Sequence, residues 1–173
     1  MLYQNLMNEL LFKAEEKFGK RKEATKIRGV EINASGPCLW FNNYNLDDVT
    51  IYISYDCIDN YDLARFQIAH EVIHTLYTNK QENTTNLEEG LAVFFQLKES
   101  PTIGIEDGAN EYRNACELVT QLINDNPQII KQAREIEPNI SKISTDLLLQ
   151  LKSNIDLKQL NELTQIFPKY LPH

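Results

Sequence analysis

The chain has 173 residues, of which 42% are hydrophobic and 24% charged, and it carries a formal net charge of −8. This length and composition predict one globular domain with its own core, and they exclude collagen-like, low-complexity and disordered proteins. The negative charge argues against non-specific binding to nucleic acid, and the lack of any long apolar run argues against a membrane-spanning segment.

An amphipathic helix is predicted at the start, where apolar residues recur at helical spacing up to Gly19. Three segments of β-forming composition follow, at residues 27–33, 37–42 and 48–56. In the third segment Val49, Ile51 and Ile53 alternate with less apolar residues, which indicates a strand with one buried face. The turn-forming residues between the segments favour antiparallel connections, so we expect a small, mostly antiparallel sheet.

From residue 62 onward the apolar spacing becomes helical, with Asp59 or Asn60 as the expected N-cap, and a polar loop covers residues 78–86. Further helices are predicted at 87–99 and 110–125, and shorter ones near 129–136, 145–151 and 157–167. A small sheet followed by helices is typical of an α+β fold. We therefore predict a single domain, 1–173, made of an N-terminal helix and sheet (1–60), a central helix pair (61–99) and a helical C-terminal part (100–173).

The segment HEVIH contains two of the three histidines, His70 and His74. Residues i and i+4 share one face of a helix, so both imidazoles can bind one cation. Leu63 and Phe66 lie on the same face, so we expect this face of the helix to be turned toward the apolar interior. Glu71 lies about a quarter-turn away, off the ligand row, where a general base would stand. These residue types favour one zinc ion. Water bound to such an ion has a pKa of about 7, and Glu71 could activate this water for peptide hydrolysis.

A third ligand has to come from another part of the chain. Glu88 and Glu89 are candidates, on a helix that the loop after His74 would let fold back. Both have another possible role, because a threonine or asparagine three residues earlier would complete a capping box with either one. Helical periodicity places Glu88 nearer the apolar border and Glu89 with Gln96 on the polar side.

The segments HEVIH and EEGLA together resemble the gluzincin branch of zinc metallopeptidases, most closely the thermolysin-like catalytic core of the aminopeptidase N type. The resemblance implies a zincin-like fold, with an active-site helix followed by a glutamate helix. In that family the ligand is the glutamate just before the glycine, which implies Glu89, with Glu88 in reserve. EYRNACELVTQL is similar to the family's helix whose first tyrosine stabilises the tetrahedral intermediate, which implies a catalytic role for Tyr112. Residues 48–56 would correspond to the edge strand that binds extended peptides by strand addition.

The resemblance covers roughly residues 48–125 and has departures. The aminopeptidase segment G-x-M-E-N has no counterpart, so exopeptidase activity is not implied. The spacing between His74 and Glu89 is shorter than in the large enzymes. Small regulatory proteases of the ImmA/IrrE type are also similar, but their A-N-x-F-A segment is not matched by GLAVFFQ.

The sequence thus predicts a zinc metallopeptidase with one zinc per chain, acting as a narrow-specificity endopeptidase on a peptide or protein substrate. One alternative is an ImmA/IrrE-like regulatory protease that acts on one partner. Others are a metal-binding interaction module with weak or lost catalysis, and a helical interaction protein with a chance motif. The first 20 residues lack a signal-peptide pattern and the three cysteines are widely spaced, so we expect a cytoplasmic protein. The oligomeric state stays open.

Overall fold

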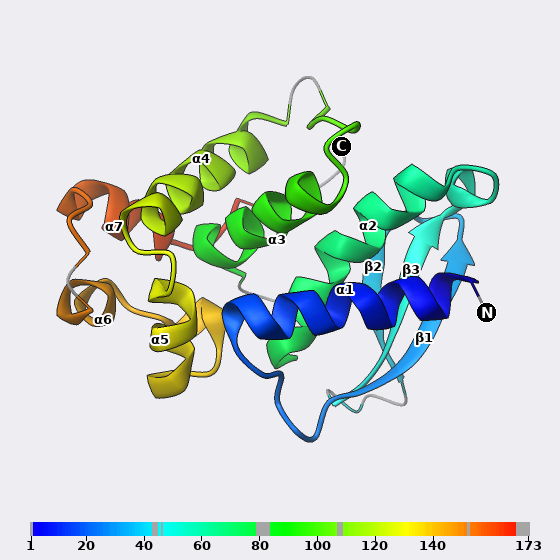
Figure 1. The fold of residues 1–173 in the computed structure, drawn as a ribbon, viewed down its shortest axis with the longest axis horizontal. Coiled ribbons are helices and arrows are strands. Elements are labelled where there is room, and N and C mark those ends of the chain that lie inside the picture. Colours follow the sequence, from blue (N-terminus) through cyan, green and yellow to red (C-terminus); the bar gives the residue numbers. More distant parts are fainter. Residues whose placement is uncertain are drawn as a thin grey trace.

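The computed structural model describes residues 2–42, 45, 47–78, 84–106, 109–151 and 153–168. The α-helices are α1 (Leu2–Phe18), α2 (Tyr61–His74), α3 (Asn86–Glu99), α4 (Asn110–Asp125), α5 (Ile129–Ile136), α6 (Thr145–Gln150) and α7 (Leu157–Leu163). The strands are β1 (Lys26–Asn33), β2 (Cys38–Phe41) and β3 (Asp48–Ser54). The predicted α+β class is confirmed, and Figure 1 shows the sheet at one end of the molecule and α5 to α7 at the other. None of the helices within these ranges has the length and apolar character needed to cross a membrane.

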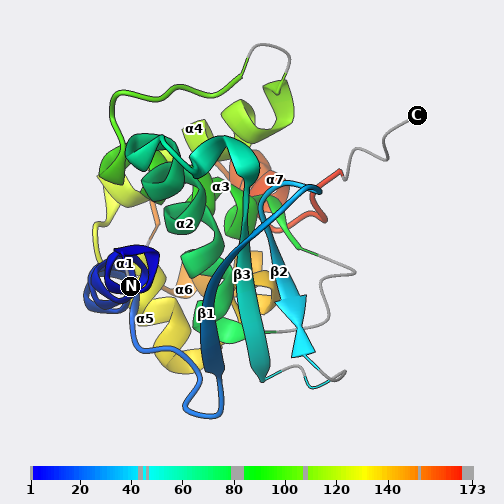
Figure 2. The ribbon, with the colours of Figure 1, turned by 90° about the vertical axis from the view of Figure 1, so that its right-hand side faces the viewer.

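The sheet is mixed, with the strand order β1-β3-β2 that Figure 2 shows. β2 pairs antiparallel with β3, but β1 pairs parallel with β3 on its other side. The prediction of a mostly antiparallel sheet is therefore wrong. The reason lies in β3, whose Val49, Ile51 and Ile53 are fully buried: this most apolar strand takes the central position, where a neighbour covers each edge.

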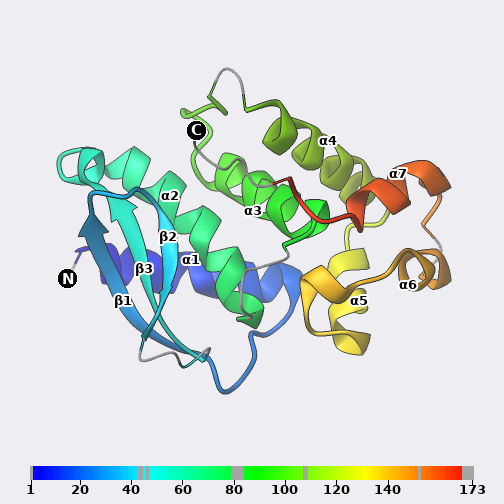
Figure 3. The same cartoon turned by 180° about the vertical axis from the view of Figure 1, so that it is seen from behind.

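One face of the sheet is covered by helices α1 and α2, and in Figure 3 the strands lie in front of α1. The predicted spacing in α1 is confirmed by the burial of Leu6, Leu10 and Ala14. α1 ends where Gly19 adopts a positive φ of 94°, a conformation that glycine reaches without steric strain. At the start of α2, the side chain of Asn60 accepts a hydrogen bond from the backbone N–H of Leu63, which confirms one of the two expected N-caps.

A buried arginine, Arg134, joins the ends of three helical segments. Its guanidinium donates hydrogen bonds of 2.7–3.2 Å to five backbone carbonyl oxygens, those of Phe18, Gly19, Lys20, Leu76 and Pro138. Burial lowers its pKa to about 10, so the side chain stays charged at neutral pH. Because carbonyl oxygens at helix C-termini carry partial negative charge, this one cation satisfies them and holds the end of α1 near the end of α2.

Helix α3 is the centre of the molecule and packs against α2 on one side and α4 on the other. Ten consecutive residues, from Leu87 to Gln96, are buried. Gly90 lies where α4 comes closest to α3, since a Cβ there would meet the backbone of Ala115. Glycine at this position lets the two helices approach closely, which brings the start of α4 next to the start of α3.

The C-terminal end of the described chain returns to the start of α3. α7 ends at Leu163, four residues before the predicted end, because the following residues pair with those preceding α3. The backbone N–H of Phe167 donates to Thr84 O at 2.8 Å, and that of Asn86 donates to Gln165 O at 2.9 Å. The predicted loop at 78–86 lies in large part outside the described residues.

An alanine at Gly90 should destabilise the protein, although alanine is usually the better helix former by about 1 kcal/mol. Its Cβ would lie 2.6 Å from the carbonyl carbon of Ala115 and 2.8 Å from Val119 Cγ2, and the backbone atom cannot rotate away. We expect Gly90→Ala to lower the free energy of unfolding in urea by about 1–3 kcal/mol. Gly104→Ala is the control, since nothing lies within 4 Å of its added Cβ. Equal losses in both variants would contradict the packing argument.

Candidate metal centre

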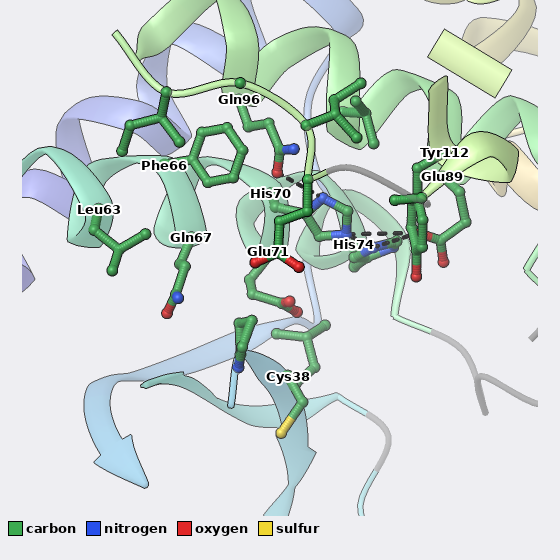
Figure 4. A pocket seen from close by; sticks show the side chains of 18 of the residues that line it. Cys38, Leu63, Phe66, Gln67, His70, Glu71, His74, Glu89, Gln96 and Tyr112 are labelled. Atoms are coloured by element: carbon green, nitrogen blue, oxygen red, sulfur yellow. Dashed lines mark hydrogen bonds and ion pairs between the residues drawn. The ribbon is translucent and has the colours of Figure 1, made fainter. Parts of the chain in front are cut away.

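The three predicted ligands meet between α2 and α3. His70, His74 and Glu89 each offer a ligand atom, and these atoms lie within 4.8 Å of one another. The two Nε2 atoms are 3.3 Å apart, and Glu89 Oε2 lies 3.5 Å from His70 Nε2 and 3.7 Å from His74 Nε2. Figure 4 shows the two imidazoles and this carboxylate turned toward one another. This group could bind a metal ion.

Both imidazoles are oriented by polar side chains of α3. His74 Nδ1 lies 2.8 Å from Glu88 Oε1, and His70 Nδ1 lies 2.9 Å from Gln96 Oε1. A carboxylate oxygen can only accept, so Nδ1 of His74 carries the proton, and the amide oxygen of Gln96 assigns the same tautomer to His70. In the neutral form of each imidazole, Nε2 therefore has the lone pair and directs it at the common point, as metal ligation requires.

Glu88, which the sequence left as the reserve ligand, instead contacts the candidate ligand His74 at Nδ1, the ring nitrogen that faces away from the group. Sequence reasoning missed this role and that of Gln96, although one signal was present: Gln96 follows Glu89 by seven residues, two helical turns, and so shares its face. Helical periodicity placed Glu89 on a polar side of α3, but α3 is buried on all sides from Leu87 to Gln96, and Glu88 and Glu89 are only 5% and 8% exposed. A helix without a solvent face has no polar side to identify.

Neither glutamate forms a complete capping box, the alternative role that the sequence left open. The hydroxyl of Thr85 accepts from the backbone N–H of Glu88 at 3.4 Å, which is half of a capping box. The other half of the box, from the N–H of Thr85 to the Glu88 carboxylate, is replaced. The N–H of Thr85 donates to the hydroxyl of Ser141 at 3.1 Å, and the Glu88 carboxylate accepts from His74 and Ser141 instead. The side chain of Asn86 donates to Glu162 O at 2.7 Å instead of pairing with Glu89.

The charges at the centre favour a cation. Burial by itself lowers the pKa of His74, but the carboxylates of Glu89 and Glu88 outweigh it and raise the pKa to about 10. Burial likewise acts to raise the pKa of Glu89, and the neighbouring histidines reverse this and lower it to about 2. A buried carboxylate pair beside His74 thus stabilises positive charge at the point where the ligands converge.

The three candidate ligands line an open cleft of about 510 Å³. Glu71 also lines this cleft, and burial raises the pKa of its carboxyl. Leu63 and Phe66 are half-buried in the wall of the same cleft, as Figure 4 shows. The expectation that this face of α2 looks into the interior is therefore wrong; Ile68, Val72 and their neighbours on the other face fill the core instead.

Tyr112 reaches the cleft from the first turn of α4. Its ring centroid lies 6.4 Å from that of His70 and 4.6 Å from that of Phe167, which supports it from behind. Burial, with the charges of Glu89 and Glu71 adding to it, raises the pKa of the phenol to about 12. The hydroxyl therefore keeps its proton at neutral pH and can serve as a hydrogen-bond donor.

The strand that borders the cleft is β2, whereas the family resemblance implied the edge-strand role for residues 48–56. β3 is the central strand, and both of its edges are occupied by neighbours. Cys38 and Leu39 of β2 line the cleft, and β2 has β3 on one side only in the sheet. The strand order, which periodicity does not reveal, is the reason for this correction.

Comparisons with protein-family models, with curated proteins and with solved structures found no match to this chain. Its chemistry is therefore inferred from the geometry of its own residues. That geometry brings together all five site residues that the sequence indicated, with His70, Glu71, His74, Glu89 and Tyr112 lining one cleft.

The purified protein should hold about one zinc ion per chain, measured by mass spectrometry after dialysis. Glu89→Ala should abolish this stoichiometric binding, because it removes a ligand. Glu88→Ala should retain zinc with an affinity about 10–100-fold lower, because it removes only the partner that orients His74. The reverse pattern, zinc retained without Glu89 and lost without Glu88, would make Glu88 the ligand.

Proposed function

We propose that this protein is a zinc-dependent peptidase, a narrow-specificity endopeptidase of the gluzincin kind. The observation that supports this most directly is the convergence of His70, His74 and Glu89 in an open cleft that also contains Glu71. A metal scaffold needs the first three residues only. A fourth residue, the carboxylate of Glu71, buried beside them and outside the ligand set, is what hydrolysis would add.

The donor set and its spacing fit zinc. A tetrahedral site with bonds of about 2.0–2.1 Å has ligand atoms about 3.3–3.4 Å apart. The observed separations of 3.3, 3.5 and 3.7 Å are close to this value. Two imidazoles and one carboxylate leave a fourth position open, and a zinc ion bound here would supply Lewis acidity toward a substrate carbonyl and a water molecule.

Glu71 and Tyr112 supply the remaining roles in the proposal. Glu71 would accept a proton from the attacking water and pass it to the departing amine, and its position in the cleft near the ligand group suits this task. Tyr112 would donate its phenolic proton in a hydrogen bond to the oxyanion that develops on the substrate carbonyl. Glu71 lies on α2 and Tyr112 on α4, so both side chains are positioned by helices before a substrate binds.

The cleft also suits an extended peptide. β2 lies at the edge of the sheet and borders the cleft, so a substrate strand could pair along it. The opposite wall is apolar and is formed by Leu63, Phe66, Ile103 and Ile105. A peptide backbone held along β2 would place side chains against this wall.

Glu71→Gln should bind zinc as the wild type does and lose hydrolysis by a factor of about 10²–10⁴, because the amide cannot accept the proton. The measurement is cleavage of a quenched-fluorescence peptide library by zinc-loaded protein, with zinc content determined in parallel. Leu63→Ala is a matched control on the same helix and in the same cleft, and it should retain hydrolysis while altering the preferred peptides. Cleavage by the glutamine variant at the wild-type rate would rule out this role of Glu71.

For Tyr112→Phe we expect kcat to fall about 10²-fold, the scale of one lost oxyanion donor. Zinc content and unfolding temperature should stay at wild-type values, since the phenylalanine ring preserves the contact with Phe167. The substrate is the library peptide that the wild type cleaves fastest. An unchanged kcat would remove Tyr112 from the catalytic group and leave it a packing role.

A further inference from the structure

A serine far along the chain contacts the metal centre through Glu88. Ser141 lies in a short 3₁₀ turn, η5 (Ile140–Lys142), and its hydroxyl donates to Glu88 Oε2. The other oxygen of Glu88 pairs with Nδ1 of His74 at 2.8 Å. The continuous path therefore runs from Ser141 through Glu88 to a candidate ligand.

The direction of each hydrogen bond in this path is determined by its neighbours. Ser141 Oγ accepts from the backbone N–H of Thr85 at 3.1 Å, so its own proton is available to the carboxylate, which can only accept. With both oxygens engaged, Glu88 is held away from the point where the three ligand atoms meet. The same two bonds hold His74 in the tautomer that points Nε2 at that point.

The turn that carries Ser141 is held by its own hydrogen bond and by buried neighbours. The side chain of Asn139, which is 3% exposed, accepts from the backbone N–H of Ser141 at 3.1 Å. Ile140 and Ile143, on either side, are each 2% exposed. The C-terminal segment (residues 139–151 and 153–167) also pairs with Thr84 through Phe167 and with Asn86 through Gln165, so it holds the start of α3 from two sides.

We propose that Ser141 is a positioning residue for the metal centre, and that the C-terminal segment sets the metal affinity through Ser141, Glu88 and His74. This inference rests on the proposed function, in that it takes the His70–His74–Glu89 group to bind zinc. Partners that orient a ligating histidine usually contribute about 10–100-fold to metal affinity. Ser141 acts one step further out, and about tenfold is the expected effect.

The test compares Ser141→Ala with Ser144→Ala by competition against a chromogenic zinc chelator at fixed pH. Ser144 is a matched control, because its hydroxyl caps α6 in the same C-terminal segment and accepts from the backbone N–H of Leu147, without contact to Glu88. Both variants lose a capping or turn hydrogen bond, and both should unfold at a lower temperature in the zinc-free form. Only Ser141→Ala should weaken zinc binding, about tenfold, and Ser141→Thr should restore it.

A double variant tests whether the effect passes through Glu88. In a Glu88→Ala background, Ser141→Ala should cause no additional loss of zinc affinity, since Ser141 has no carboxylate to hold. Equal zinc affinity in the wild type and Ser141→Ala would overturn the inference and leave the proposed function intact. An equal loss in Ser144→Ala would also overturn it, because the effect would then be general destabilisation. A wild type that binds no zinc would overturn both proposals.

Discussion

The structure depends on one buried contact, where two imidazoles of α2 face the carboxylates of α3. His74, Glu88 and Glu89 are each at most 8% exposed, and charged groups at such depth are tolerated only when they are paired and hydrogen-bonded. Their partners come from the facing helix, so these pairs favour the observed register between α2 and α3. With α3 in this position, Gly90 lets α4 pack closely against it, and Thr85 caps its first turn.

This contact explains why the central helix carries polar residues that a core helix would usually lack. Glu88, Glu89 and Gln96 are buried on α3, and each faces a histidine of α2. Apolar side chains of similar volume would pack here at a lower electrostatic cost. Such a departure from the usual core composition is expected where a protein places a functional site.

The two ends of the molecule contribute differently to the cleft. The sheet borders the cleft through β2, while the C-terminal segment lies behind the site and contacts its residues through Ser141 and Phe167. Support from behind matters because ligand atoms held within a few tenths of an ångström bind a metal without reorganisation. β2 can vary in sequence without disturbing that geometry, since it touches none of the hydrogen bonds that orient the two histidines.

The sequence by itself indicated where the helices lie and which side chains gather in the cleft. The spacing in HEVIH put two imidazoles on one face of a helix, and periodicity located α2, α3 and α4 within a few residues, because helical neighbours are local in the chain. Only the tertiary structure decided the strand order, the choice of Glu89 over Glu88 as the residue that meets both histidines, and the place of Ser141. These depend on which surfaces pack together across many intervening residues, and no local period records that. On a helix buried all round, two adjacent glutamates look alike until their neighbours are known.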